Sequence, residues 1–182
     1  MVLPGRSLLN GEVEVDETFI GGVKSGGKRG RGAPGKVLVM VAAEIRGRRM
    51  GRIRLQLIPD ATGPTLLDAV EGLAESGSDI VTDGWSGYAG LPKRRFHHTV
   101  SRHDQSVGEN LLPHVDLVAS LLKRWLLGTH HGAVGHHLLQ FYLDEFAFRF
   151  NRRTSTSRGL LFYRLLQQAM VHPPVPVADL NL

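Results

Sequence analysis

Hydrophobic residues in the first part of the chain alternate with polar ones or form short runs, which is the pattern of β-strands. Residues 11–22 contain valine, phenylalanine and isoleucine and end in two glycines, so they predict a first strand closed by a turn. Residues 36–45 predict a buried second strand, and residues 51–58 predict a third one after the basic turn 46–49. Three consecutive strands with short links predict an antiparallel meander.

After the third strand the apolar residues take the spacing of a helix, which we predict over residues 65–76 and which Gly77 ends. Residues 79–84 and 96–101 predict two further short strands. A helix that connects two strands of one sheet usually places the second strand parallel to a neighbour. The pattern therefore predicts a mixed sheet whose later strands are parallel.

The rest of the chain predicts helices over residues 111–127, 136–153 and 159–171. The last of them is expected to bury part of its apolar surface, namely Leu160, Leu161, Tyr163, Leu165 and Leu166. We expect one domain over residues 11–171, preceded by an unstructured lead (1–10) and followed by a mobile, proline-rich tail (172–182).

Composition narrows the class of protein. The chain has 182 residues and no cysteine, which excludes disulfides, zinc ribbons and thiol catalysis and is typical of the reducing cytoplasm. Its longest apolar run, residues 37–43, is too short to span a bilayer. We therefore expect a cytoplasmic protein that does not enter a membrane.

The basic residues are concentrated in one part of the sequence. The formal net charge is +5, and ten of the 22 Lys and Arg residues lie between Lys24 and Arg54 together with a single acid, Glu44. This segregation indicates a polyanionic partner, nucleic acid before membrane. The glycine-rich loop 24–32 is read equally well as a phosphate-contacting loop or as a flexible connector.

The predicted first strand carries four carboxylates, Glu12, Glu14, Asp16 and Glu17. Buried carboxylates are costly unless they are paired or hold a cation, so this strand is a candidate metal site. A solvated edge strand is the alternative explanation. Asp83 ends the predicted fourth strand, where an Asp-Gly pair is also a common turn.

A third acid lies on the helix predicted over residues 111–127. Asp116 and Lys123 are seven residues apart, so they project from nearly the same side of that helix. A solvated helix face explains such a pair on its own. In the company of Asp16 and Asp83, however, Asp116 gives three carboxylates from separate elements that can converge on a pair of metal ions.

Two other groups of polar residues have simpler explanations. His97, His98 and His103 suggest a metal cluster, but adjacent histidines on a strand point to opposite faces, so surface or core histidines are preferred. Glu145 and Arg149 have the i,i+4 spacing of a helix ion pair.

Four motifs in this order resemble the DDE transposases of bacterial insertion sequences, in particular their ISXO-type branch. The first-acid motif resembles residues 13–22, Val-Glu-Val-Asp-Glu-Thr-Phe-Ile-Gly-Gly, and the second-acid motif resembles residues 82–88, Thr-Asp-Gly-Trp-Ser-Gly-Tyr. The segment after the third acid resembles residues 121–131, Leu-Leu-Lys-Arg-Trp-Leu-Leu-Gly-Thr-His-His, and the closing helix resembles residues 142–152. The resemblance runs from about residue 11 to residue 170.

The resemblance implies an α/β, RNase H-like mixed sheet of three antiparallel strands, a crossover helix and parallel strands, flanked by helices. It also implies cleavage and strand transfer of DNA with two Mg²⁺ or Mn²⁺ ions. Asp16 would bridge the ions, with Asp83 and Asp116 each supporting one of them. Lys123 would contact a transposon-end phosphate, and Arg149 and Arg152 are further candidates for DNA contact. The partners implied are double-stranded DNA, as transposon ends and target, and further copies of the chain in a homo-oligomer on that DNA.

The chain departs from the family pattern in two places. The third catalytic position is commonly Glu, or Asn in some members, whereas here it is Asp116, with His114 as a second candidate. The family also usually carries an amino-terminal zinc ribbon, which a chain without cysteine cannot form, so a truncated copy is expected. An inactive DNA-binding relative, an RNase H-like nuclease and a purely structural domain are the alternatives.

Overall fold

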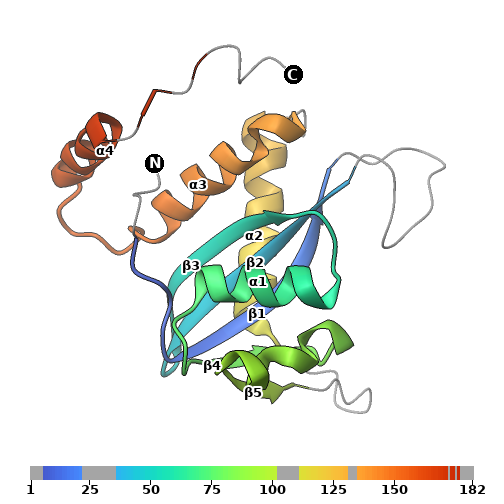
Figure 1. Ribbon diagram of the computed structural model, residues 1–182. Helices are drawn as coiled ribbons and strands as arrows, with labels where there is room; N and C mark the ends of the chain where they lie inside the picture. The colour runs from blue at the N-terminus through green and yellow to red at the C-terminus, as the bar shows by residue number, and fades with distance from the viewer. Residues whose placement is uncertain are drawn as a thin grey trace.

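The fold is built on one five-stranded sheet with the strand order β3-β2-β1-β4-β5 (Figure 1). The computed structural model describes residues 6–21, 36–101, 111–130, 135–171, 173–174 and 176. The strands are β1 (Glu12–Ile20), β2 (Val37–Arg46), β3 (Arg49–Ile58), β4 (Asp79–Thr82) and β5 (His97–Val100).

The sheet is antiparallel on one side of β1 and parallel on the other. β1 pairs with β2, and β2 with β3, in antiparallel fashion, whereas β4 runs parallel to both β1 and β5. The helix α1 (Gly63–Leu73) makes the crossover between β3 and β4. The predicted α/β fold, a mixed RNase H-like sheet with flanking helices, is confirmed.

Helices cover both faces of the sheet, and the alternation along β2 shows why. Leu38, Met40 and Ala42 belong to the core under α1, whereas Val39 and Val41 belong to the opposite core. That second core is closed by α2 (Pro113–His130) and α3 (Leu139–Phe150) (Figure 1). Because β2 is buried on both faces, its sequence is a continuous apolar run rather than an alternating one.

The chain before β1 also packs against the domain. Leu9 is fully buried and forms an isolated parallel bridge with Ala74. The amide of Leu9 donates to the carbonyl of Leu73, and the amide of Glu75 donates to the carbonyl of Leu9, both within 2.9 Å. This bridge draws the chain out of the helix, so α1 ends at Leu73 rather than at the predicted residue 76.

A 3₁₀ segment, η1 (Ser86–Arg94), follows β4 where the sequence pattern predicts no element. It contains two glycines and Pro92 and lacks a helical repeat of apolar residues, which is why periodicity does not reveal it. Its residues Tyr88 and Leu91 are nonetheless fully buried in the core beside α1. A shorter 3₁₀ segment, η2 (His136–Leu138), leads into α3.

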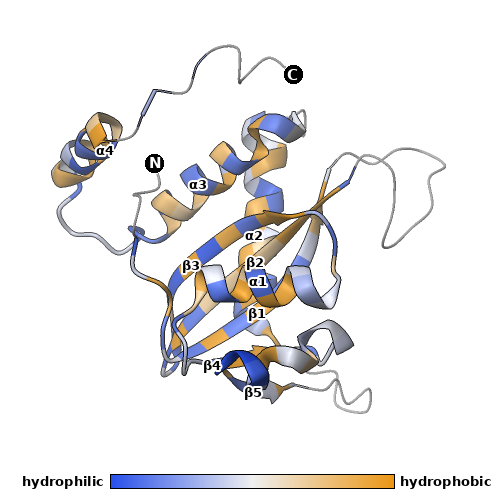
Figure 2. Cartoon of the chain, viewed as in Figure 1, coloured by the Kyte–Doolittle hydropathy of each residue, from blue (hydrophilic) through white to orange (hydrophobic). Residues whose placement is uncertain are grey.

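The last helix, α4 (Gly159–Val171), has the predicted bounds but not the predicted burial. Leu160, Tyr163 and Leu166 are 53%, 64% and 48% exposed, so the expectation that they pack into the domain is wrong. Figure 1 shows α4 standing away from the sheet, and Figure 2 shows that much of this helix is hydrophobic. Helical spacing identifies an apolar face, but it does not tell whether another part of the chain covers that face.

Three sequence predictions lie wholly or mostly outside the described residues, namely the glycine-rich loop 24–32, the side chain of His103 and the tail 172–182, of which only residues 173–174 and 176 are described. Among the helices that the structure describes, none combines the length and the hydrophobicity needed to cross a membrane.

Candidate active site

Asp16 lies in the middle strand of the sheet, where β1 is flanked on both sides. It is partly buried and sits opposite Val41 of the neighbouring β2. Its Oδ1 accepts a hydrogen bond of 2.8 Å from the amide of Glu17, the next residue along the strand. The pairing of β1 with β4 ends at Glu14, whereas its pairing with β2 continues past Asp16 to Ile20, so the backbone at Asp16 is held by β2.

Asp83 follows β4 directly, and the strand register brings it level with Asp16. Glu14 pairs with Val81 across the parallel β1–β4 ladder, so the positions two residues further along are Asp16 and Asp83. Paired residues of parallel strands point to the same face, which here is the face that carries α2. The sheet therefore brings together two acids that are 67 positions apart in the sequence.

Asp83 also takes part in the turn that the sequence suggested as the simpler explanation. Its Oδ1 accepts a hydrogen bond of 2.9 Å from the amide of Trp85. Gly84 has a φ of +82°, and a Cβ atom added there would collide with Val100, so only glycine fits this turn. The turn aims the chain away from β4 immediately after the acid and leaves the Asp83 side chain exposed.

Asp116 is placed by a contact that the sequence did not reveal. Glu14, only 5% exposed, reaches the first turn of α2, where its Oε2 accepts hydrogen bonds from the amides of His114 (2.8 Å) and Val115 (3.0 Å). Its Oε1 accepts a third, of 2.6 Å, from Nδ1 of His114. A carboxylate is well suited to this end of a helix because the first amides lack partners and carry partial positive charge. Glu14 thus fastens α2 to β1 beside Asp16, with Asp116 two residues further along the helix.

The pKa of Asp16 reflects its burial first and the neighbouring acids second. Burial raises the pKa of Asp16 to about 7, and the negative charges of Glu17, Asp83 and Asp116 contribute to the increase, although the hydrogen bond from the Glu17 amide opposes it. The acids at the end of β4 and on α2 therefore add to the cost of a negative charge on Asp16. A cation placed among them would lower that cost.

Glu44 shows how the same protein treats a buried acid with basic partners. Burial alone would raise its pKa, but hydrogen bonds and the positive charge of Arg52, together with the charge of Arg46, lower it to about 2. The Arg52–Glu44 and Arg46–Glu44 ion pairs measure 2.8 and 2.9 Å. Glu44 is thus a satisfied structural acid, whereas Asp16 is surrounded by further acids.

Glu17 belongs to a separate contact on the α1 side of the sheet. The hydroxyl of Tyr88 in η1 donates a hydrogen bond of 2.7 Å to Glu17 Oε1. Burial, followed by the nearby charge of Glu17, raises the pKa of Tyr88, so its phenol stays protonated and remains a donor. This bond ties η1 to β1 next to Asp16.

The remaining predicted site residues are dispersed. Lys123 is exposed on α2, and Arg149 pairs with Glu145 at 2.7 Å, which confirms the predicted helix ion pair. Arg152 lies just beyond the end of α3 and donates to the carbonyl of Phe148. Within the described part of the chain, no three His, Asp or Glu side chains are grouped closely enough to hold a metal ion as they stand.

The histidines of β5 do not form a cluster within the described residues. His97 is exposed, whereas His98 shares a hydrogen bond of 2.9 Å with the hydroxyl of Thr82. Burial lowers the pKa of His98, which favours the neutral ring.

Comparison with known families identifies the architecture that carries these acids. The model of the ISXO2-like transposase domain matches residues 8–151, which include the whole sheet and helices α1 to α3. The chain belongs to the ISXO2-like transposase family. A search among proteins of curated function finds no match.

The match confirms the resemblance found in the sequence and gives this transposase domain its general role in DNA transposition. Residues 152–182, which include α4, lie beyond the matched segment. Sequence reasoning missed Glu14 as a residue that organises the site. The alternation along β1 places Glu14 and Asp16 on one face of the sheet. The partner of Glu14, His114, is 100 residues away, so local spacing in the sequence does not reveal the contact.

Proposed function

We propose that this transposase domain cleaves DNA and transfers the cut strand with divalent metal ions held by Asp16, Asp83 and Asp116. The observation that carries the proposal is the strand register, which brings Asp16 and Asp83 level on the face of the sheet that carries α2, the helix of Asp116. Burial raises the pKa of Asp16, and the charges of Glu17, Asp83 and Asp116 add to the increase. A buried acid with a raised pKa beside other acids is a candidate functional group.

The chemistry of the donors fits Mg²⁺ or Mn²⁺. All three side chains offer carboxylate oxygens, the ligands that these hard cations prefer, and the central Asp16 is the candidate for the bridging ligand. When bound, two such ions activate the attacking oxygen and stabilise the leaving oxygen at a phosphate. The Glu17 amide holds Asp16 Oδ1, and the Asp83 turn holds Asp83 Oδ1 at the end of β4. These residues provide the fixed part of the site.

For the third position we infer Asp116 rather than His114. Nδ1 of His114 is engaged by Glu14, and this contact, together with two amide bonds, serves to dock α2 on β1. Asp116 is exposed on the same helix, and its charge acts on Asp16. His114 therefore has a positioning role, and Asp116 is the acid that completes the set.

Contacts to the DNA backbone would come from basic side chains near the acids and farther away. Lys123 lies seven residues beyond Asp116 on α2 and is exposed, so it is our candidate for a phosphate close to the reacting one. Arg149 and Arg152 at the end of α3 are candidates for phosphates farther along the DNA. Contacts of this kind position DNA without reading its sequence.

The proposal is tested by joining a fluorescent duplex oligonucleotide to supercoiled plasmid in the presence of Mn²⁺. We expect joined product with the wild-type chain and at least about a thousand-fold less with Asp16→Asn, Asp83→Asn or Asp116→Asn, as is common when essential catalytic groups are removed. Asp60→Asn is the matched control, because Asp60 is an exposed acid whose Oδ1 accepts hydrogen bonds from the amide and the hydroxyl of Thr62, two residues along the chain. His114→Gln should lower joining much less than Asp116→Asn.

An inactive DNA-binding relative is the second candidate. Two observations favour it: the described residues contain no assembled group of three metal ligands, and the shorter Asp116 stands where the family commonly has Glu. If DNA binding survives in all three Asp→Asn variants while the wild type neither nicks nor joins DNA, this candidate is correct. Nicking of the plasmid without joining of the oligonucleotide would instead identify an RNase H-like nuclease.

A further inference from the structure

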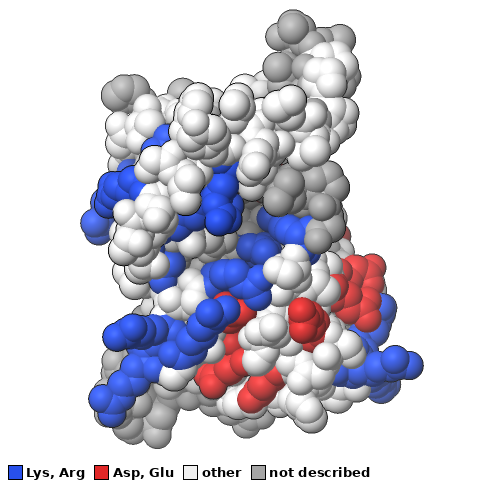
Figure 3. All heavy atoms as spheres, turned by 90° about the vertical axis from the view of Figure 1, so that its left-hand side faces the viewer, with Lys and Arg blue, Asp and Glu red and all other residues white. Residues whose placement is uncertain are grey.

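Two adjoining hollows lined by arginines lie between the end of α3 and α4, and they share Arg152 and Leu161. The first hollow is also lined by Arg149, Arg153 and Arg158, and the second by Arg164. Figure 3 shows Lys and Arg side chains gathered on this face of the molecule. We call the two hollows together the arginine cleft.

The positive charge of the arginine cleft is poorly balanced by the described residues. The one acid in its lining is Glu145, and that side chain is paired with Arg149. Arg152 lines both hollows, and it shares the second hollow and a further one beside α4 with Arg164. Two like charges from separate elements are thus near each other, and burial, followed by the charge of Arg164, lowers the pKa of Arg152. Such an arrangement favours an anion between them.

The cleft also has an apolar side, formed by Phe148, Leu161, Phe162 and Leu165. The guanidinium of Arg152 stacks on the ring of Phe148, 3.8 Å from its centroid, while the ring of Phe162 is 66% exposed on α4. A DNA duplex turns its phosphates outward and keeps its bases stacked inside, so its base faces cannot contact the apolar residues of the cleft. An unpaired strand offers both phosphates for arginines and base faces for aromatic rings.

We propose that the arginine cleft binds an unpaired nucleic-acid strand that passes Arg152 from one hollow to the other, with Arg152 and Arg164 on its phosphates and Phe162, in the first hollow, against a base. This inference builds on the proposed function, because it names the form of nucleic acid that one further surface of the transposase holds. It does not depend on the metal-binding acids. Arg152, Arg158, Phe162 and Arg164 lie beyond the segment matched by the family model.

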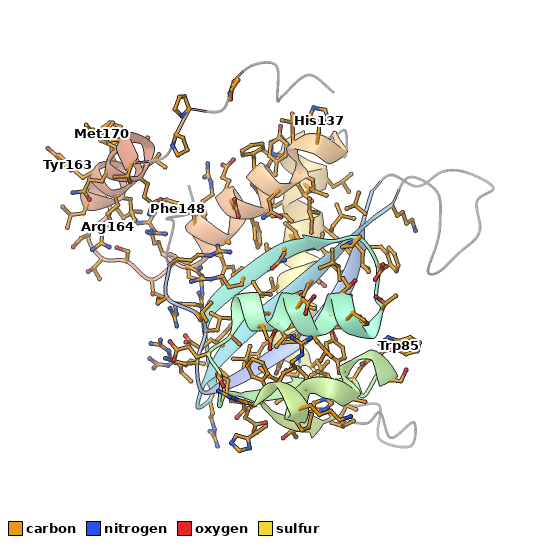
Figure 4. All side chains as sticks on the ribbon, in the orientation of Figure 1. Trp85, His137, Phe148, Tyr163, Arg164 and Met170 are labelled. Atoms are coloured by element: carbon orange, nitrogen blue, oxygen red, sulfur yellow. The ribbon has the colours of Figure 1, made fainter. Side chains whose placement is uncertain are left out.

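The arginine cleft is remote from the acids. Figure 4 places Phe148, Tyr163 and Arg164 on one side of the molecule, and Trp85, two residues after Asp83, on the opposite side. The strand in the cleft is therefore separate from the phosphate that would react at Asp16. The domain would hold this unpaired part of the nucleic acid in the cleft while it cuts another part at the acids.

The test measures binding of a fluorescent oligothymidine and of a mixed-sequence duplex by anisotropy, with EDTA present so that the metal-binding acids play no part. We expect the wild type to bind the single strand more tightly than the duplex. Arg152→Gln and Arg164→Gln should each weaken single-strand binding about 5-fold or more and reduce the salt dependence by about one phosphate contact. Phe162→Ala should weaken single-strand binding about 5-fold or more and leave duplex binding unchanged.

Two variants separate the cleft from other effects. Arg94→Gln also removes one positive charge, but Arg94 lies far from the cleft and pairs with Asp68 and Glu71. This variant should therefore keep a single-strand affinity within about 2-fold of wild type. Asp16→Asn should bind the single strand like wild type, even though it abolishes strand joining. Circular dichroism verifies that each variant is folded.

The proposal is overturned if Arg152→Gln and Arg164→Gln bind like Arg94→Gln, or if the single strand and the duplex bind equally and Phe162→Ala changes neither. It is also overturned if Phe162→Ala disrupts a dimer of the chain without changing nucleic-acid binding, because α4 would then pair with a second copy. Failure of strand joining in the wild type, with cleft binding intact, would count against the proposed function alone.

Discussion

The acids around Asp16 and the arginine cleft both hold like charges close together, but they differ in how the fold supports them. Asp16, Asp83 and Asp116 come from a central strand, the end of its parallel neighbour and a helix fastened to that strand by Glu14. The arginine cleft instead depends on α4, whose only buried residue is Gln168.

This difference teaches where rigidity is needed. A site that holds small cations requires carboxylates fixed to within a fraction of an ångström, and sheet register together with a buried helix cap provides that. A surface that contacts a flexible nucleic-acid strand does not need positions fixed so closely. Of the twelve exposed large hydrophobic side chains among the described residues, seven lie on α4, so this helix has apolar surface left to contribute to binding.

The largest expected effect on stability comes from a substitution that removes the contact between α2 and β1 beside the acids. Glu14→Ala removes three hydrogen bonds and leaves the His114 and Val115 amides without their partner. We expect the free energy of unfolding to fall by about 3 kcal/mol, measured by urea denaturation. Glu12→Ala is the matched control, since Glu12 lies on the same strand and is exposed, and it should change stability by less than about 0.5 kcal/mol. Equal effects of the two substitutions would show that Glu14 does not anchor α2.

A smaller effect, opposite in sign at neutral pH, is expected for Asp16→Asn without metal. Folding raises the pKa of Asp16 from near 3.8 to about 7, so the folded protein binds this proton more tightly than the unfolded chain does. The free energy of unfolding of the wild type therefore falls as the pH rises from about 4 to about 7, and it stays lower above that window. Asn carries no charge and avoids this loss.

We therefore expect Asp16→Asn to be more stable than the wild type at pH 8, by about 2–3 kcal/mol, and nearly equal to it at pH 4. Thermal or urea unfolding in EDTA at both pH values measures this. Adding Mn²⁺ at pH 8 should raise the stability of the wild type and leave Asp16→Asn unchanged. A variant that is less stable than the wild type at pH 8 would show that Asp16 is not opposed by its neighbours.

The smallest effect is expected in α4. Phe162→Ser should change the free energy of unfolding by less than about 0.5 kcal/mol, because the ring is largely exposed. Phe146→Ala in α3 is the comparison, and it should cost about 3 kcal/mol because its ring is buried in the core under α2 and α3. Similar losses for both would mean that α4 is packed as firmly as α3.

Much of the fold can be predicted from the sequence because the spacing of apolar residues and the residues that form turns are local features. The valines of β1 and β2, the crossover helix and the short β4 are each recognisable within a dozen residues, and the family match confirms the RNase H-like arrangement. The bounds of α4 are predicted correctly for the same reason. The exposure of α4 is not predicted, because the burial of a helix depends on whether another part of the protein packs against it.

The site is predicted less completely, since its contacts join distant residues. The acids Asp16, Asp83 and Asp116 are suggested by their motifs, and their roles as ligands stay a prediction. Glu14 escapes sequence reasoning because the amides it caps are about 100 residues away. Tyr88 escapes it because the 3₁₀ segment that carries it has no apolar period, although its hydroxyl bonds to Glu17.

Titration of the wild-type chain with Mn²⁺ at pH 8, followed by the loss of the free-ion electron paramagnetic resonance signal, tests the central claim most directly. We predict saturable binding that weakens below about pH 7, as Asp16 takes up its proton, and that is lost in Asp16→Asn, Asp83→Asn and Asp116→Asn but kept in Asp60→Asn. Wild-type affinity in all three of the first variants would contradict the claim that these carboxylates share a cation site.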